Sequence, residues 1–465
     1  MSERNQVGFF GDLSLDYKNF LYLNVSARKD WVSNLQKGFN SATYPSASLS
    51  FLPTEAFKVL KAEKGLNYLK LRSSYGTSTR FPSGYPIDFR IGQNTNDSFK
   101  DESGNSISVQ TVSGDKDAEI VPEFVKEWEF GLEAKFFKNR GTLDFSYFDK
   151  RTEDIISTVT AAPSTGNFGI LTNTGAAKSS GVEISLGFDI VKSNKFKWNS
   201  TVNFTSHNET FVKRENDPFT SIGNNRSFSF GGFGNIGQNA AVVGRSLGAI
   251  VGTRLKRNED GVPIIDSRGY YITERRDENN LPFVVGDAIP DYRMNVYNTF
   301  NYKDWTFSFM VHHTKGGDLF TQVPSLLLGR GLIKDNLKDH ENLIVIPGVT
   351  ESGEPNTVAI TGDQYWRLNV ANGATELKIY DASLIRLQEM SLGYSLPSKT
   401  LDKLPFNSLS IIATGYNLYH RAYNTPKGAN IDTNTTGPGP GNNRGIDYSS
   451  SPGSRRYGIT LKASF

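Results

Sequence analysis

The segment Arg456-Tyr-Gly-Ile-Thr-Leu-Lys-Ala-Ser-Phe465 ends the chain and alternates strictly between apolar and small or polar side chains. In an extended strand, successive side chains point to opposite faces of the sheet. One face of this segment would carry the side chains of Tyr457, Ile459, Leu461, Ala463 and Phe465. The other face would carry Gly458, Thr460, Lys462 and Ser464. The pattern therefore predicts an amphipathic β-strand that finishes on an aromatic residue.

Such a strand is typical of the C-terminus of a bacterial outer-membrane β-barrel. In the bilayer one face of the strand meets lipid, the other meets a wet lumen, and no backbone edge can stay unpaired. The barrel assembly machinery reads this terminal segment, so we expect it to be a partner of the chain. The expected assembly signal comprises Tyr457, Ile459, Leu461 and Phe465.

The composition of the chain fits this interpretation. Its 465 residues include 44 glycines and 12 % aromatic residues, which suit strands and turns, and it contains no cysteine. The mean hydropathy is −0.42, and no apolar run approaches the ~18 residues of a transmembrane helix. The net charge of +3 is too small to indicate nucleic-acid binding. Residues 1–6 contain no apolar core of a signal peptide, so we expect the start of an exported protein to lie upstream.

Segments with a period of two residues recur along the whole chain. With a residue or two added at each end, most approach the ~9–11 residues that a tilted strand needs to cross a bilayer. Helical spacing fits them less well. Together with the terminal strand they predict about thirteen strands. The segments are residues 7–15, 21–28, 46–51, 69–75, 127–136, 142–147, 182–188, 198–204, 292–300, 305–311, 390–396 and 409–413.

The connections between these segments alternate in length. Short links lie at residues 18–19, 138–140, 191–195 and 303–304, with longer ones at 53–65 and 397–407. Long polar stretches cover residues 29–45, 77–126, 151–180, 207–290, 314–381 and 417–455. Outer-membrane barrels combine short periplasmic turns with long extracellular loops, whereas compact soluble domains rarely hold loops beyond ~12–15 residues. We therefore predict an all-β fold, a transmembrane antiparallel β-barrel; a β-sandwich or propeller with insertions is the alternative.

Several motifs make the prediction more specific. They are YPSASLSF at residues 44–51, VPEFVKEWEFGLE at 121–133, YFDKRTEDII at 147–156, NTGAAKSSGVEI at 173–184, GDAIPDY at 286–292, DASLIRLQEMSLGYSLP at 381–397 and GYNL at 415–418. In this order, and with Phe465 at the end, they resemble the C-terminal half of the SusC/RagA family of TonB-dependent outer-membrane transporters of Bacteroidetes. The resemblance covers nearly the whole chain. It departs at the N-terminus, where the family's signal peptide, TonB box, plug domain and early strands have no counterpart.

The resemblance implies that residues 1–465 form the C-terminal part of a barrel of about 22 strands that encloses a plug. It further implies import energised by TonB through the missing N-terminal part. A SusD-like surface lipoprotein would cover the barrel, and the substrate would be an oligosaccharide or a peptide. A passive porin or a surface adhesin on a similar barrel is the alternative function. A plug domain preceded by a TonB box in the upstream sequence would decide between them.

No group of residues indicates an enzyme, a metal site or a cofactor. His312 and His313 are neighbours on a predicted strand and would point to opposite faces, which suits a shared metal poorly. Residues 258–261, with the sequence NEDG, lack the spacing of a calcium-binding loop and fit a polar hairpin turn. Residues 437–441, with the sequence GPGPG, have too few amide donors to cradle a phosphate.

The aromatic and charged residues suggest several structural roles. Near strand ends we expect interfacial girdles around Trp31, Trp128, Trp198 and Trp305. In the long loops we expect contacts with the lipoprotein or with a sugar ring, from Tyr365, Trp366, Tyr270, Tyr271 and the aromatic cluster at residues 228–233. Facing the lumen, we expect charges that line the pore or hold the plug, from Lys70, Arg72, Glu127, Glu129 and Glu133.

Overall fold

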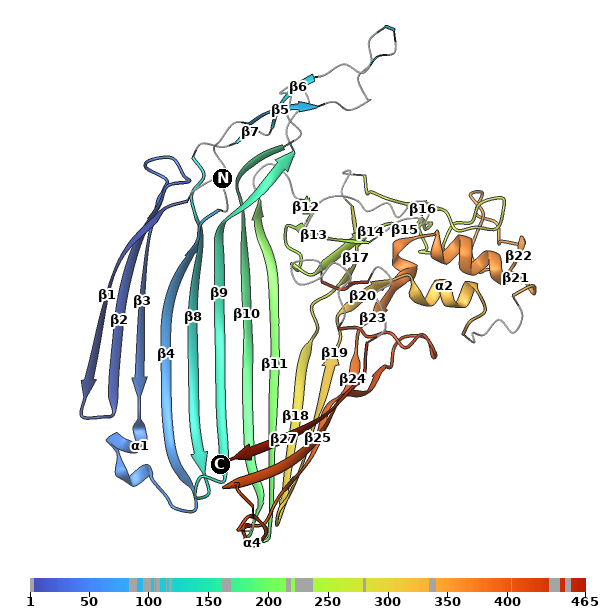
Figure 1. The fold of residues 1–465 in the computed structure, drawn as a ribbon. Coiled ribbons are helices and arrows are strands. Elements are labelled where there is room, and N and C mark those ends of the chain that lie inside the picture. The colour runs from blue at the N-terminus through green and yellow to red at the C-terminus, as the bar shows by residue number, and fades with distance from the viewer. Residues whose placement is uncertain are drawn as a thin grey trace.

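Most of the chain folds into one tall, curved wall of strands (Figure 1). The computed structural model describes residues 4–82, 90–94, 102–103, 105, 109–113, 115–116, 119–160, 169–214, 219–221, 237–278, 282–333, 340–402, 404–434, 444–447 and 453–465. The predicted aromatic cluster at 228–233 and the stretch 437–441 lie outside these residues. Among the described residues, no helix is long and apolar enough to cross a membrane.

The wall is a sheet of 14 strands, thirteen of which follow one continuous antiparallel path. This confirms the predicted fold class and the expected number of strands. The strands on the path are β1 (Gln6–Tyr17), β2 (Leu21–Val32), β3 (Ser41–Phe51), β4 (Leu66–Arg80), β8 (Glu123–Phe136), β9 (Gly141–Thr160), β10 (Gly169–Lys192), β11 (Phe196–Arg214), β18 (Tyr292–Tyr302), β19 (Trp305–Lys315), β24 (Leu384–Ser395), β25 (Ser408–Ala422) and β27 (Arg456–Ser464). The remaining strand, β7 (Asp115–Lys116), pairs in parallel with β10.

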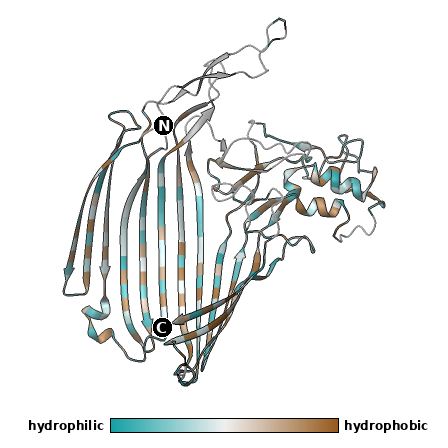
Figure 2. Ribbon diagram, in the orientation of Figure 1, coloured by the Kyte–Doolittle hydropathy of each residue, from teal (hydrophilic) through white to brown (hydrophobic). Residues whose placement is uncertain are grey.

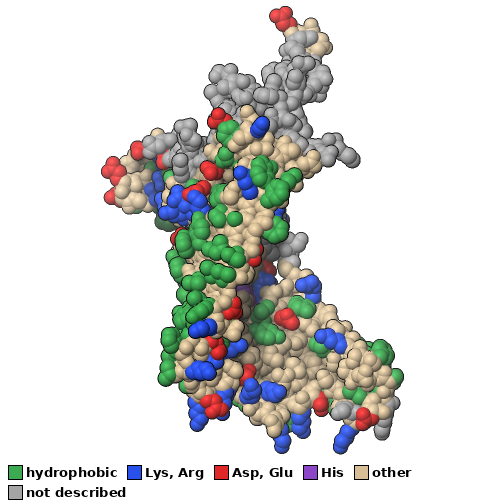
Figure 3. Space-filling model, turned by 90° about the vertical axis from the view of Figure 1, so that its left-hand side faces the viewer, with side chains coloured by type: hydrophobic (Ala, Val, Ile, Leu, Met, Phe, Trp, Pro, Cys, Tyr) green, Lys and Arg blue, Asp and Glu red, His purple; other side chains and the backbone are tan. Residues whose placement is uncertain are grey.

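The register separates an apolar face from a polar face. Cross-strand partners on one face form an apolar row of Trp198, Phe300, Phe307, Leu392, Ala413 and Ile459. Partners on the opposite face form a polar row of Lys70, Glu133, Asp144, Ser185, Asn203, Asn295, His312 and Arg386. Figure 2 shows this alternation along the strands, and in Figure 3 hydrophobic side chains gather along one side of the wall. In a barrel the apolar face meets lipid and the polar face lines the lumen.

Several strands are longer than the sequence pattern predicted. β9, β10 and β11 contain 20, 24 and 19 residues, about twice the ~10 that cross a bilayer. The prediction of a loop over residues 29–45 was wrong in its bounds, because β2 and β3 leave only residues 33–40 between them. The loop predicted over residues 151–180 is shortened in the same way. Beyond the bilayer both faces of a strand meet water, so the apolar alternation stops while the ladder of hydrogen bonds continues.

The short links lie at one end of the wall and form tight turns. Lys18, Asn19, Lys138, Asn139 and Lys303 have a positive φ there. The two longer links contain short helices that the sequence pattern did not predict: α1 (Pro53–Ala56), η1 (Lys58–Leu60) and α4 (Ser398–Leu401). β3 ends opposite Leu71, so the edge of β4 is open below that residue. Helix α1 covers this edge, since the Thr54 hydroxyl accepts a bond from the Leu69 amide at 3.1 Å.

At the other end, residues 237–278, 282–291, 316–333, 340–383 and 444–447 fold together into what we call the loop assembly (Figure 1). Its elements include β13 (Gln238–Val242), β14 (Ala249–Gly252), β15 (Arg254–Leu255), β16 (Thr273–Glu274), β17 (Phe283–Asp287), β20 (Asp318–Thr321), α2 (Val323–Gly329), β21 (Leu343–Val345), β22 (Ala359–Thr361), α3 (Gly362–Gln364), η3 (Tyr365–Ala371), η4 (Thr375–Lys378), β23 (Ile379–Asp381) and β26 (Ile446–Asp447). Strand β12 (Phe219–Ser221) pairs with β13, and β5 (Arg90–Asn94) with β6 (Val109–Ser113). The assembly has its own apolar core, built on Ile250, Phe320 and Ile446.

Candidate functional site

A network of charged side chains occupies the polar face of the wall. The Arg72 guanidinium lies 3.0 Å from Glu133, 3.1 Å from Asp144 and 3.4 Å from Glu129. Lys70 reaches the same Glu133 carboxylate at 3.0 Å. Gly131 makes this packing possible, because a Cβ there would lie 2.3 Å from the Arg72 Nε. The structure thus brings together on the lumenal face four of the five charged residues predicted to line the pore, with Glu127 further along and in register with Lys150.

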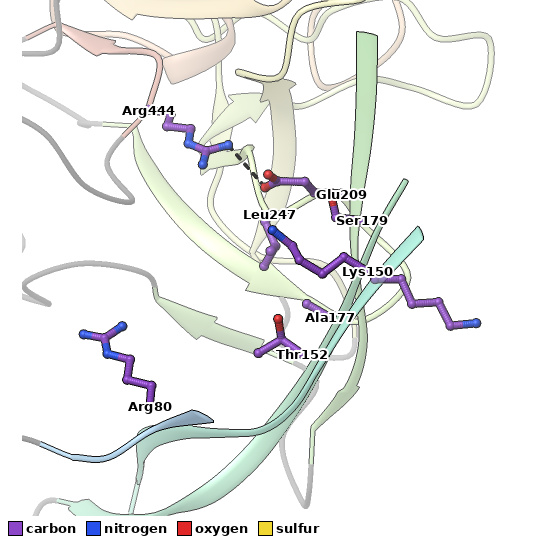
Figure 4. A pocket seen from close by; sticks show the side chains of 9 residues that line it. Arg80, Lys150, Thr152, Ala177, Ser179, Glu209, Leu247 and Arg444 are labelled. Carbon is purple, nitrogen blue, oxygen red and sulfur yellow. Dashed lines mark hydrogen bonds and ion pairs between the residues drawn. The ribbon is translucent and has the colours of Figure 1, made fainter. Parts of the chain in front are cut away.

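Above this network, a polar pocket of about 410 Å³ lies where the wall meets the loops (Figure 4). We call it the rim pocket. It is lined by Arg80, Lys150, Thr152, Ala177, Lys178, Ser179, Glu209, Leu247 and Arg444. Lys150, Ser179 and Glu209 are cross-strand partners on β9, β10 and β11. Their register places them on the same lumenal face as the charged network.

Among the described residues that line the rim pocket, Glu209 is the only carboxylate, and neighbouring side chains engage it. Arg444 Nη1 donates to Glu209 Oε2 at 3.2 Å, and the other oxygen of Glu209 lies 3.6 Å from His207 Nε2. Arg444 belongs to the loop before β26, so this ion pair ties a late loop to the wall. Figure 4 shows Arg80, Lys150 and Arg444 around the cavity.

A second tether joins the last loop to the wall. The side chains of Arg386 on β24 and Asp432 form a buried ion pair, and the Arg386 guanidinium also donates to Asn417 at 3.3 Å. The Thr433 hydroxyl donates to the Ala382 carbonyl at 2.7 Å. These contacts bring residues 432–433 against the lumenal side of the wall.

The two neighbouring histidines contact different residues on the two faces. His312 lies on the lumenal face, where its ring nitrogens are 2.8 Å from Asn295 Oδ1 and 2.9 Å from the Thr314 hydroxyl. The His313 ring stacks on Tyr423 with a centroid distance of 6.0 Å. Among the described residues, no group of three or more His, Asp or Glu side chains is placed to hold a metal ion.

The four loop aromatics singled out from the sequence lie together in the loop assembly. Tyr270, Tyr271 and Tyr365 pack against a core of Ile265, Ile346 and Ile360. Trp366 follows on η3 and contacts the Tyr365 ring edge-on at 5.0 Å. The Tyr271 amide donates to Asn369 Oδ1 at 2.7 Å, and burial raises the pKa of the Tyr271 and Tyr365 hydroxyls. These tyrosines therefore help to hold the assembly together, and contact with a ligand or lid stays a prediction.

A buried lysine, Lys378, stabilises the loop assembly at the C-terminal end of η3. Lys378 is 0 % exposed, and its ammonium donates to the carbonyls of Ala371 and Gly373 at 3.0 and 3.2 Å. These carbonyls lie at the C-terminal end of η3, where a cation is favourable. Burial lowers the pKa of Lys378 to about 8. No feature of the sequence distinguishes this lysine from its exposed counterparts.

Comparison with known proteins identifies the fold. The sequence profile of the family described as "TonB dependent receptor-like, beta-barrel" matches residues 2–323. The chain belongs to this family. TonB-dependent receptor P3 of Formosa agariphila is 23 % identical over 496 residues, covering 100 % of this chain and 46 % of the relative. TonB-dependent receptor P26 of the same organism is 24 % identical over 434 residues, covering 88 % and 41 %.

A solved structure agrees with this assignment. The RagAB peptide transporter matches 100 % of this chain and 48 % of its own chain, with a TM-score of 0.70 and 17 % identity. The family match confirms the predicted TonB-dependent receptor barrel, and the RagAB match shows the fold of the family that the motifs resemble. The chain spans about half the length of the relatives that it matches. As a TonB-dependent receptor β-barrel, it is an outer-membrane protein.

The aromatic residues of this receptor wall form two levels. Near the short turns, the Trp305 and Tyr394 rings lie 4.7 Å apart and the Trp198 and Phe300 rings 5.4 Å apart. Near the loop end, the rings of Trp128 and Tyr75 lie 4.7 Å apart, and Trp31 contacts Phe9 edge-on at 6.1 Å. This arrangement is that of two interfacial girdles.

The remaining sequence predictions concern a turn and the C-terminus. Residues 258–261 form the predicted polar hairpin turn, in which Asn258 Oδ1 accepts from the Val262 amide at 2.9 Å. The terminal strand β27 pairs with β25 as expected, and the Phe465 and Phe406 rings lie 5.0 Å apart. Its role as an assembly signal stays a prediction. The absence of a catalytic or cofactor site also stays a prediction.

Proposed function

We propose that residues 1–465 form the C-terminal wall and outer loops of a transporter that imports large nutrients across the outer membrane. TonB supplies the energy through the N-terminal part of the protein, and the substrate is an oligosaccharide or a peptide. The observation that carries this proposal is the charged lumenal face, which leads from the Arg72 network up to the rim pocket under a folded loop assembly. Membership of the TonB-dependent receptor family supports it.

A SusD-like lipoprotein completes the proposed transporter on the cell surface. Support comes from apolar side chains on the outside of the loop assembly, where Leu343 and Val345 on β21 are 71 % and 52 % exposed and Leu332 after α2 is 65 % exposed. Exposed apolar side chains that gather in one region mark protein contacts. The structural relative RagAB is itself a peptide transporter.

TonB dependence is the test of the function. In cells that produce the full-length protein, we expect growth on a transported oligosaccharide or peptide to stop when TonB is depleted. Energised transport requires TonB, whereas a passive porin or an adhesin does not. Growth that continued unchanged without TonB would favour the porin and overturn the proposal.

The apolar surface of β21 provides a second prediction. We expect the double variant Leu343→Asp/Val345→Asp to lower co-purification of the lipoprotein with the barrel, because charges would replace apolar contacts at the interface. Val59 is the matched control, since it is 90 % exposed but lies on η1 among the short turns at the other end of the wall. Equal loss with Val59→Asp would show that the effect is not specific to the loop assembly.

A further inference from the structure

The rim pocket carries an excess of positive charge on the proposed transport path. Arg80, Lys150 and Arg444 bring cations to the pocket and Glu209 brings a carboxylate. Lys178 is in register with Arg151 and therefore lies on the opposite face of the wall. The carboxylate, Glu209, already accepts from Arg444 at 3.2 Å and faces His207 at 3.6 Å. The Glu209 side chain is only 17 % exposed. It is therefore already engaged by Arg444 and His207 and forms no ion pair with Arg80 or Lys150.

Two of these cations lie opposite carboxylates across the ladder: Arg80 is in register with Glu123, and Lys150 with Glu127. Neither carboxylate lines the pocket. Neither the Arg80 guanidinium nor the Lys150 ammonium forms an ion pair within the part of the chain that the structure describes. The neighbouring Arg151 contrasts with them, because it lies on the opposite face of β9 and pairs with Glu153 at 3.0 Å. Unpaired cations that share a concave site raise the local concentration of anions.

Neutral donors accompany the cations. The side chains of Thr152 and Ser179 line the same cavity, and in Figure 4 both lie close to Lys150. Their hydroxyls can donate hydrogen bonds to an oxyanion. A guanidinium, an ammonium and two hydroxyls form a donor set for a carboxylate, and charge-assisted hydrogen bonds of this kind are the strong ones. A volume of about 410 Å³ lies within the ~300–1,000 Å³ of small-ligand sites.

We propose that the rim pocket binds a carboxylate group of the oligomer that enters the barrel, through Arg80 and Lys150. This inference rests on the proposed import function and narrows its substrate to acidic oligomers. Both an acidic peptide and an oligosaccharide of uronic acids offer this group. The carboxylate would be held on the lumenal face, below the loop assembly and above the Arg72 network.

The test measures binding of four probes to the purified full-length protein at low salt: tetraglutamate, tetragalacturonate and, as their neutral counterparts, tetraglutamine and galactotetraose. At least one acidic probe should bind more tightly than its neutral counterpart, and which one binds identifies the peptide or sugar source. Arg80→Gln and Lys150→Gln should each weaken this binding about tenfold, as expected for the loss of a hydrogen bond to a charged group. Glu209→Gln should tighten it, because it removes the negative charge of the one carboxylate among the described lining residues.

Arg151→Gln is the matched control, since it removes the same charge from the adjacent residue on the opposite face. It should leave the affinity within about twofold, as for an exposed ion pair. The proposal is overturned if no acidic probe binds better than its neutral counterpart, or if Arg151→Gln weakens binding as much as Lys150→Gln. Growth that depends on TonB would in that case still support the import function. Growth independent of TonB would overturn the import function without affecting these affinities.

Discussion

Aspartate at Ile459 is expected to reduce the folded barrel in the outer membrane several-fold, while aspartate at the next residue, Thr460, has a mild effect. Ile459 belongs to the apolar row with Ala413 and Leu392, whereas Thr460 points to the lumen. On the lipid face, a charge at mid-membrane costs ~2–4 kcal/mol for Lys or Arg and less for Asp, falling to ~0–1 kcal/mol near the interfaces. The measurements are outer-membrane abundance and heat-modifiable migration of the full-length protein.

The register also predicts how the effect of an aspartate on membrane insertion varies with its position along β27. Leu461 lies on the same face as Ile459 but two residues further toward the short turns, and thus nearer the interface. Aspartate at Leu461 should therefore be less damaging than at Ile459, yet more damaging than at Lys462 on the lumenal face. Deletion of Phe465 tests the assembly signal itself and should also lower abundance. Equal damage at Ile459 and Thr460 would refute the assignment of the two faces.

The sequence predicted the membrane-spanning wall because each strand there separates lipid from water. Ile459 and Thr460 show this directly, since their alternation follows from the two solvents. Above the bilayer this cause disappears, and strands such as β10 continue with side chains such as Lys178 and Ser179 that follow no apolar period. Their sequence is that of a loop, although the backbone ladder persists.

The rim pocket and the loop assembly could not be predicted from local pattern. Glu209 and Arg444 are 235 residues apart, and the pocket forms only once four strands and two loops are in register. The core residues Ile250, Phe320 and Ile446 come from separate loops that each look polar overall. The sequence identifies Tyr271 and Tyr365 as aromatic residues in loops, but no local pattern predicts that both pack on one apolar core. One part of the pocket could be predicted from the sequence: the short turn between β8 and β9 sets the register of these strands, and this register places Lys150 on the same face as Arg72.

The buried Lys378 is expected to make the free energy of unfolding of the loop assembly depend on pH. Its ammonium is buried against two carbonyls, and its pKa is lowered to about 8, whereas an unfolded lysine titrates near ~10.4. Above pH 8 the unfolded state binds a proton that the folded state has released, so the free energy of unfolding rises with pH. Between pH 7 and pH 9.5 the expected increase is about 2 kcal/mol.

Trp366 allows this increase to be measured, because the other four tryptophans of residues 1–465 lie on wall strands. Urea unfolding of the loop assembly, followed by Trp366 fluorescence, should require more denaturant at pH 9.5 than at pH 7. The pH range of the experiment ends below the pKa of ordinary tyrosines, which is ~10. Burial raises the pKa of Tyr380, two residues after Lys378, to about 12. Lys378→Met has a similar volume and no titratable group, so its unfolding should lose the dependence on pH. A pH profile that persisted in Lys378→Met would assign the effect to another group and refute the role of this lysine.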